Sequence, residues 1–64
     1  MSELLTYAEA GEALGVTART IFRLVNRGVV PVVRLSRKLV RIRRLDLDAL
    51  VLARTERRLG RAAS

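Results

Sequence analysis

A connection of only three residues, 15–17, separates two segments with helical periodicity, and it limits the folds that this chain can adopt. The first segment begins after Thr6, which has Glu9 three residues later, the spacing of a capping box. Gly15 supplies the left-handed residue that commonly ends a helix. We therefore predict a first helix over residues 7–14 that ends in a tight turn.

The second segment has one apolar and one polar face. Thr17 caps it and Gly28 stops it. Its apolar stripe consists of Ile21, Leu24 and Val25. The opposite side carries Arg19, Phe22, Arg23 and Asn26. Two short helices joined so tightly have the geometry of a helix-turn-helix, although such helix pairs are also ordinary core elements in many folds.

The segment that follows residue 30 predicts a β-hairpin. Pro31 cannot donate to a sheet ladder and suits the first residue of a strand. Two β-branched runs, residues 32–35 and 39–42, are separated by Ser36-Arg37-Lys38, so the tip of the hairpin is cationic. These charges either contact a partner or only discourage pairing of the sheet edge.

A third helix is predicted to open at residues 45–51, with two aspartates at its positive end. Leu47, Leu50 and Val51 share one face of this helix and should close the core. A second apolar stripe with a spacing of seven lies on the opposite face and suggests a surface for a protein partner. It consists of Leu45, Leu52 and Leu59. The alternative is that these are ordinary exposed or terminal leucines.

The length of the chain, 64 residues, is that of one small domain. The predicted fold class is mainly α with a small β-hairpin, in the order α-α-β-β-α. We expect this domain to span residues 1–56, followed by a basic mobile tail over residues 57–64.

Composition excludes several kinds of function. The chain has neither cysteine nor histidine, so the usual zinc ligands and general bases are missing, and we expect no metal, no cofactor and no enzymatic activity. No apolar run approaches the roughly 20 residues that span a bilayer, and the acidic N-terminus lacks the cationic start of a signal peptide. We expect a cytoplasmic protein that binds neither membranes nor small-molecule substrates.

Basic side chains are concentrated in one block. Residues 17–44 contain nine basic side chains and no acidic one, whereas the charged side chains before this block are all acidic. The net charge of +7 is therefore unevenly distributed along the chain. Such a field attracts phosphate, which makes nucleic acid the first hypothesis. RNA is less favoured, because a single aromatic residue on the candidate surface offers little base stacking. An alternative is an adaptor whose basic face binds an acidic protein.

Short motifs follow one another in a distinctive order over residues 3–52. They are Leu4-Leu5-Thr6, Glu9-Ala10, Leu14-Gly15-Val16-Thr17, Arg19-Thr20-Ile21-Phe22-Arg23-Leu24, Gly28, Pro31 and Val33-Arg34-Leu35. This order resembles the excisionase-type winged helix-turn-helix family, which is related to the DNA-binding domains of MerR regulators. In such proteins the second helix lies in the major groove, and the hairpin wing contacts the backbone or the minor groove.

The resemblance implies a function and partners. Members that consist of this domain alone are often phage recombination directionality factors. They bind repeated sites on double-stranded DNA cooperatively, bend the DNA and direct an integrase towards prophage excision. The resemblance therefore implies an excisionase that self-associates along DNA and acts with an integrase. The alternative within the same class is a small MerR-like transcriptional regulator.

The resemblance also assigns site residues. On the second helix it places Thr17, Arg19, Thr20 and Arg23 on the groove-facing surface. The remaining predicted DNA contacts are Arg27, Arg34, Arg37, Lys38 and Arg41. Arg23 is the preferred base reader, through a bidentate contact with guanine, and a phosphate contact is the alternative. Phe22 either meets the sugar-phosphate wall or lies at the edge of the core.

Three residues depart from the family pattern. Gly11 stands where a helix former is usual, at a cost of up to about 1 kcal/mol relative to alanine. Arg43 occupies a position where proline is common before the last helix, and Ser36 replaces a frequent glycine in the wing. The resemblance therefore constrains the path of the wing less than it constrains the helix pair.

Overall fold

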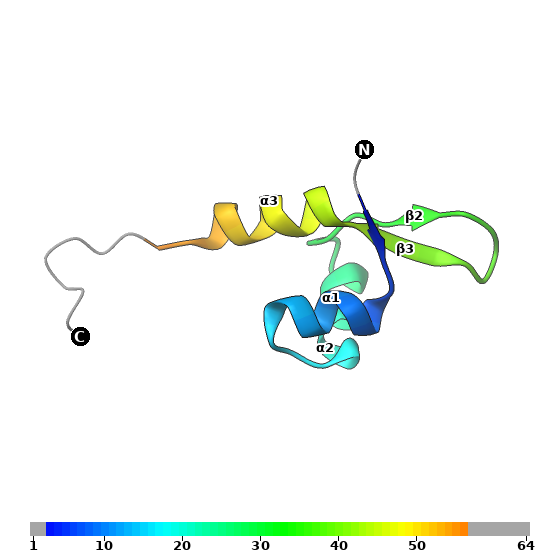
Figure 1. Cartoon of the computed structure of the whole chain (residues 1–64), viewed down its shortest axis with the longest axis horizontal. Helices are drawn as coiled ribbons and strands as arrows, with labels where there is room; N and C mark the ends of the chain where they lie inside the picture. Colours follow the sequence, from blue (N-terminus) through cyan, green and yellow to red (C-terminus); the bar gives the residue numbers. More distant parts are fainter. Residues whose placement is uncertain (1–2, 57–64) are drawn as a thin grey trace, which may run out of the picture.

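Three helices and three short strands form a small winged helix-turn-helix domain (Figure 1). The computed structural model describes residues 3–56, so Leu59 and the predicted tail lie outside the described residues. The elements follow in the order β1 (Leu4–Leu5), α1 (Tyr7–Leu14), α2 (Ala18–Asn26), β2 (Val33–Arg34), β3 (Val40–Arg43) and α3 (Arg44–Arg54). The predicted fold class is confirmed, with one additional strand, β1.

The first helix begins and ends as its sequence predicts. The Thr6 N–H donates to Glu9 Oε1 at 2.9 Å, and the Glu9 N–H donates back to Thr6 Oγ1 at 3.1 Å, which completes the capping box. Gly15 follows the helix with a φ of 75° and donates its N–H to the Glu12 carbonyl at 3.2 Å. The left-handed residue therefore turns the chain directly towards α2.

The packing of α1 against the turn requires a glycine at position 11, despite its low helix propensity. It is buried, and a Cβ atom at this position would lie 2.6 Å from the Val16 carbonyl oxygen. The Val16 N–H also donates to the Gly11 carbonyl oxygen at 2.8 Å. Only glycine allows α1 and the turn to approach so closely, and this approach brings α2 against α1.

The second helix presents the predicted apolar stripe to the core. Thr17 caps it, because its side chain accepts from the Thr20 N–H at 3.2 Å. Ile21 is fully buried, while Leu24 and Val25 are half-buried against the core cluster. The division of α2 into an apolar and a polar face is therefore confirmed.

The sheet is antiparallel, with β3 between β1 and β2. Leu5 pairs with Ile42, and Arg34 pairs with Val40. The Leu35 N–H donates to the Leu39 carbonyl at 2.7 Å and so closes the hairpin tip. The hairpin was predicted, but the pairing of β1 with β3 was not. This pairing attaches the start of the chain to the base of the wing.

The core lies between the sheet and the three helices. Its buried members are Leu5, Ala10, Ile21, Val30, Ile42 and Leu47. The prediction for α3 was right for Leu47 but wrong for Val51, which is 45% exposed. Val51 lines an open apolar hollow of about 320 Å³ between α3 and the helix pair. The side chains across this hollow, such as Leu14 and Val16, do not fill it.

Candidate nucleic-acid interface

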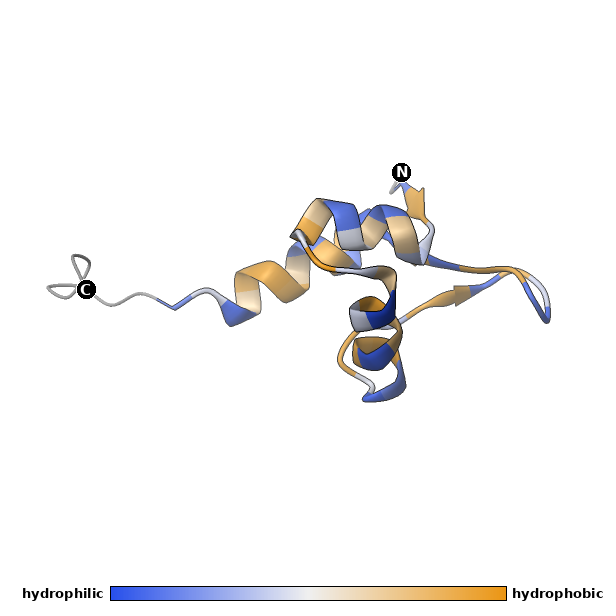
Figure 2. Ribbon diagram, turned by 90° about the horizontal axis from the view of Figure 1, so that it is seen from below, coloured by the Kyte–Doolittle hydropathy of each residue, from blue (hydrophilic) through white to orange (hydrophobic). Residues whose placement is uncertain are grey.

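The exposed face of α2 is a cationic surface. Successive residues of a helix are rotated by about 100°, so Arg19 and Arg23 lie one above the other, on the side opposite the buried Ile21. Both arginines are exposed, and so is Asn26, nearly one turn after Arg23. Figure 2 shows hydrophilic residues on α2 and at the hairpin tip, the two parts that the sequence predicts to contact a polyanion.

The two threonines at the start of α2 serve its cap. Thr17 is exposed and Thr20 is half-buried, and their hydroxyl oxygens lie 3.2 Å apart. Because Thr17 also accepts from the Thr20 N–H, its side chain is fixed at the first turn of the helix. The structure therefore brings both predicted residues to the N-terminal end of the surface that carries Arg19 and Arg23.

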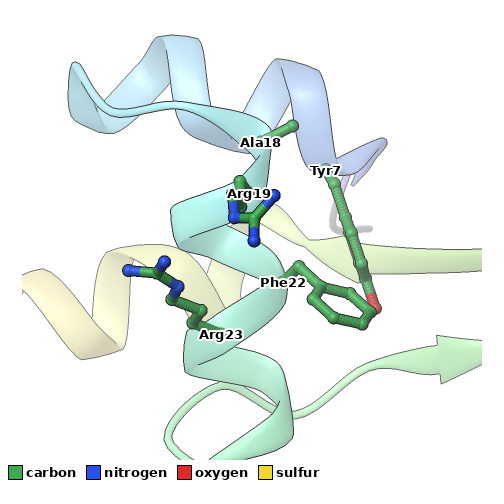
Figure 3. Close-up of a pocket in the computed structure, with 5 residues that line it drawn as sticks. All are labelled: Tyr7, Ala18, Arg19, Phe22 and Arg23. Atoms are coloured by element: carbon green, nitrogen blue, oxygen red, sulfur yellow. The ribbon is translucent and has the colours of Figure 1, made fainter.

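An aromatic pair borders the arginines. The ring centroids of Tyr7 and Phe22 are 6.3 Å apart, with the planes inclined at 53°. Together with Ala18, Arg19 and Arg23 they line a shallow hollow of about 460 Å³ (Figure 3). Phe22 is 51% exposed, so it is neither a core residue nor free of packing. The sequence does not show this contact of Tyr7, because it depends on how α1 and α2 pack.

The hairpin brings a second group of cations together. Ser36, Arg37 and Lys38 are exposed at the tip and line an open hollow there. Arg34 Nη1 donates to the Arg37 carbonyl oxygen at 3.3 Å, which braces the tip from β2. Three of the predicted contacts, Arg34, Arg37 and Lys38, therefore lie close together on the wing.

Arg41 lies on the other face of the hairpin from Arg34. Side chains of directly paired residues share a face, and the two faces alternate along a strand. Arg34 pairs with Val40, which is on the same face as the buried Ile42, whereas Arg41 pairs with Val33. Arg41 is half-buried, and its Nη1 donates to the Val40 carbonyl oxygen at 2.9 Å. The structure thus separates Arg41 from the other wing cations.

Two members of the basic block are paired with acids at the start of α3. Arg43 Nε and Nη2 donate to the two carboxylate oxygens of Asp46 at 2.7 and 2.9 Å. This hydrogen bonding from Arg43 lowers the pKa of Asp46 and raises that of the guanidinium. The Arg44 guanidinium lies 3.8 Å from a carboxylate oxygen of Glu3 and 3.8 Å from one of Asp48. The backbone N–H of Arg44 also donates to the Glu3 carbonyl oxygen at 2.7 Å.

These pairs change the interpretation of the basic block. Each ion pair between two described residues involves Arg43 or Arg44, which leaves seven of the nine bases for a partner. Arg27, one of the seven, is exposed directly after α2. The spacing of Arg43 to Asp46 and of Arg44 to Asp48 could have indicated this in the sequence. Arg43, which stands where proline is usual before the last helix, is joined to the first turn of α3 by its ion pair with Asp46.

The fold and this surface define a protein of the helix-turn-helix class. The family model described as a helix-turn-helix domain matches residues 4–55, and the chain belongs to this family. It is a DNA-binding family that includes excisionase-like proteins and is typically non-enzymatic. No significant similarity was found to a curated protein or to a solved structure.

Between residues 3 and 56, no helix has both the length and the hydropathy needed to cross a membrane. In the same part of the chain, acidic side chains do not gather into a group of three that could hold a metal ion.

Proposed function

We propose that this protein is a sequence-specific, DNA-bending accessory factor of site-specific recombination, an excisionase that directs an integrase towards prophage excision. The observation that carries the proposal is the exposure of Arg19 and Arg23 along one line of α2, in a domain whose projecting hairpin carries exposed cations at its tip. The order of sequence motifs supports the excisionase assignment within the family.

In this proposal α2 enters the major groove. An α-helix fits that groove, and arginine can make a bidentate contact with the O6 and N7 atoms of guanine. Arg23 reads a base, while Arg19 contacts a base or a phosphate. Thr17 and Thr20, at the N-terminus of α2, lie where helix N–H groups favour phosphate. Arg27 adds a phosphate contact at the other end of the helix.

The wing contacts the DNA beside the groove that α2 occupies. Arg34, Arg37 and Lys38 are near enough to one another to bind adjacent phosphates or to enter a narrowed minor groove. Arg41, on the outer face, has to reach around the hairpin for such a contact. Binding by both the helix and the wing deforms the duplex, which is the basis of the proposed bending.

One domain of this size reads too short a sequence for a unique genomic address, so we propose that several protomers bind adjacent repeats. Head-to-tail contacts between them are heterologous and extend along the DNA without closing. The outward leucines of α3 are one candidate surface, since Leu45 is 61% and Leu52 is 79% exposed. The wing of a neighbouring protomer is the other candidate.

The electrostatic part of the proposal is tested by titration with salt. If about five or six of the seven available cations neutralise phosphates, the slope of log K against log salt should be near −5, from about 0.9 for each phosphate. A slope shallower than about −2 contradicts the model. Arg43→Ala is the matched control. Because the Arg43 guanidinium is already paired with the Asp46 carboxylate, its removal should leave the slope unchanged.

The recombination role is tested on the protein's own genomic neighbourhood. We expect a footprint on repeated sites, gel-shift bands that appear cooperatively, and a circular-permutation pattern that reports a bend. With the neighbouring integrase, the protein should stimulate excision of a DNA segment between attachment sites. Independent filling of the sites with unchanged mobility would leave a simple one-site binder, and a footprint over a promoter without an integrase nearby would favour the transcriptional regulator.

A further inference from the structure

We propose that the aromatic pair of Phe22 and Tyr7 recognises the C5-methyl group of a thymine, next to the base that an arginine of α2 contacts. This inference rests on the proposed placement of α2 in the major groove. It assigns Phe22 as a residue that determines sequence specificity and Tyr7 as the residue that positions it. The hollow between them and the arginines is the pocket for the methyl group.

Phe22 lies at the edge of the arginine face of α2, rotated about 60° around the helix from Arg19 and about 100° from Arg23. It stands one turn from Arg19 and directly precedes Arg23, and about half of its surface is exposed. The fully buried residue of α2 is Ile21, which is rotated about 100° from Phe22 and faces the core. The exposed part of Phe22 is therefore apolar surface at the edge of the cationic face, and it is available to a partner.

Tyr7 holds the Phe22 ring in place. A centroid separation of 6.3 Å and an inclination of 53° are within the range of favourable tilted aromatic pairs. Tyr7 is the first residue of α1, directly after the capping box of Thr6 and Glu9, and its side chain packs against the core. In Figure 3 the Phe22 ring lies beside the Tyr7 ring, while the Arg23 side chain extends away from the pair.

The chemistry of the hollow fits a methyl group. Its lining combines two aromatic rings, the methyl group of Ala18 and the side chains of Arg19 and Arg23. On the base edges of the major groove, the thymine methyl is the apolar group, whereas guanine presents the acceptors O6 and N7. Arg19 and Phe22, one turn apart on α2, can therefore read a guanine and a neighbouring thymine at once.

The experiment measures the contribution of one methyl group. A binding site is selected from a randomised 20-base-pair duplex library, and each thymine of the selected duplex is replaced in turn by deoxyuridine, which lacks only the methyl. We expect one position at which the replacement weakens binding by about 3-fold to 10-fold, as burial of one methyl group predicts. At that position a duplex with 5-methylcytosine should bind more tightly than one with cytosine. If every deoxyuridine duplex binds within 1.5-fold of its thymine counterpart, the inference is wrong.

Variants connect the methyl effect to the aromatic pair. Phe22→Ala should bind the thymine and deoxyuridine duplexes equally, and Tyr7→Ala should reduce the difference between them. The matched control is Tyr7→Phe, which keeps the ring and should keep the full difference. Persistence of the full methyl effect in Phe22→Ala assigns the methyl contact to another residue and overturns the inference. Thermal melting checks that each variant is folded, and the deoxyuridine scan of the unmodified protein needs no variant.

The test separates this inference from the proposed function. If the protein fails to bind duplex DNA with a strong salt dependence, the proposed function fails. If salt-dependent binding and a selected motif are found but the motif shows no methyl effect, only the role of Phe22 and Tyr7 is refuted.

Discussion

Replacement of Gly11 by alanine should destabilise the protein, although alanine is the better helix former. The new Cβ would have to move from 2.6 Å to more than 3.0 Å from the Val16 carbonyl oxygen, against the backbone of the turn. Overpacking of this kind costs about 1–3 kcal/mol, and loss of the bond from the Val16 N–H costs about 0.5–1.5 kcal/mol. The gain in helix propensity offsets about 1 kcal/mol. The expected net loss is about 1–3 kcal/mol.

Thermal unfolding followed by circular dichroism measures this loss. For a domain of this size the melting temperature should fall by about 5–20 °C. The matched control is Ala13→Gly, at an exposed position of the same helix, which should cost about 0.5–1 kcal/mol through propensity alone. A Gly11→Ala variant that melts at or above the temperature of the unmodified protein refutes the close approach of α1 and the turn.

Three further predictions follow from burial, pairing and register. Ile21→Ala should lose about 2–5 kcal/mol of unfolding free energy in urea denaturation, and replacement of the half-buried Leu24 by alanine about half as much; equal losses would contradict the difference in burial between the two residues. Because the pKa of Asp46 is lowered, its ion pair stabilises the fold at pH values above the ordinary aspartate pKa of about 3.9, and this stabilisation is lost as the pH falls through the lowered pKa. In Asp46→Asn the melting temperature should therefore fall less steeply below about pH 4 than in the unmodified protein. Arg34→Ala should weaken duplex binding, measured by fluorescence anisotropy, more than Arg41→Ala does, and the reverse order would contradict the assigned faces.

The helix pair could be predicted because its signals are local. The Thr6 to Glu9 spacing and the Thr17 cap each involve residues within one turn, and both helices begin where these residues indicate. The need for Gly11 could not be predicted in this way. It depends on the distance between α1 and the Val16 carbonyl, which only the turned chain defines.

The sheet was predicted only in part, because its pairings are not all local. The hairpin of β2 and β3 has turn and strand signals in adjacent residues. The strand β1 has two residues, Leu4–Leu5, too few for an alternating pattern, and its partner Ile42 is far away in the sequence. The exposure of Val51 was missed for a related reason. Periodicity predicts the direction in which a side chain points, but not whether the helix pair opposite α3 is close enough to bury it.

In the candidate interface, too, the features that depend on local sequence were predictable, and those that depend on packing between elements were not. The exposed positions of Arg19 and Arg23 follow from helical periodicity and are confirmed as exposed. Strand alternation alone could have placed Arg34 and Arg41 on opposite faces, but only with the register in hand. The contact between Tyr7 and Phe22 joins two helices whose relative placement has no signal in either segment.

The direct passage from β3 into α3 determines where this chain can change in length. Arg43 ends the strand and Arg44 begins the helix, with no residue between them. One inserted residue would turn α3 by about 100° about its axis, so Leu47 would leave the core and Arg44 would leave Glu3. The hairpin tip between Leu35 and Leu39 is exposed, and its residues do not belong to the buried core. Insertions and deletions are therefore compatible with the fold at the wing tip and incompatible with it at the junction of β3 and α3.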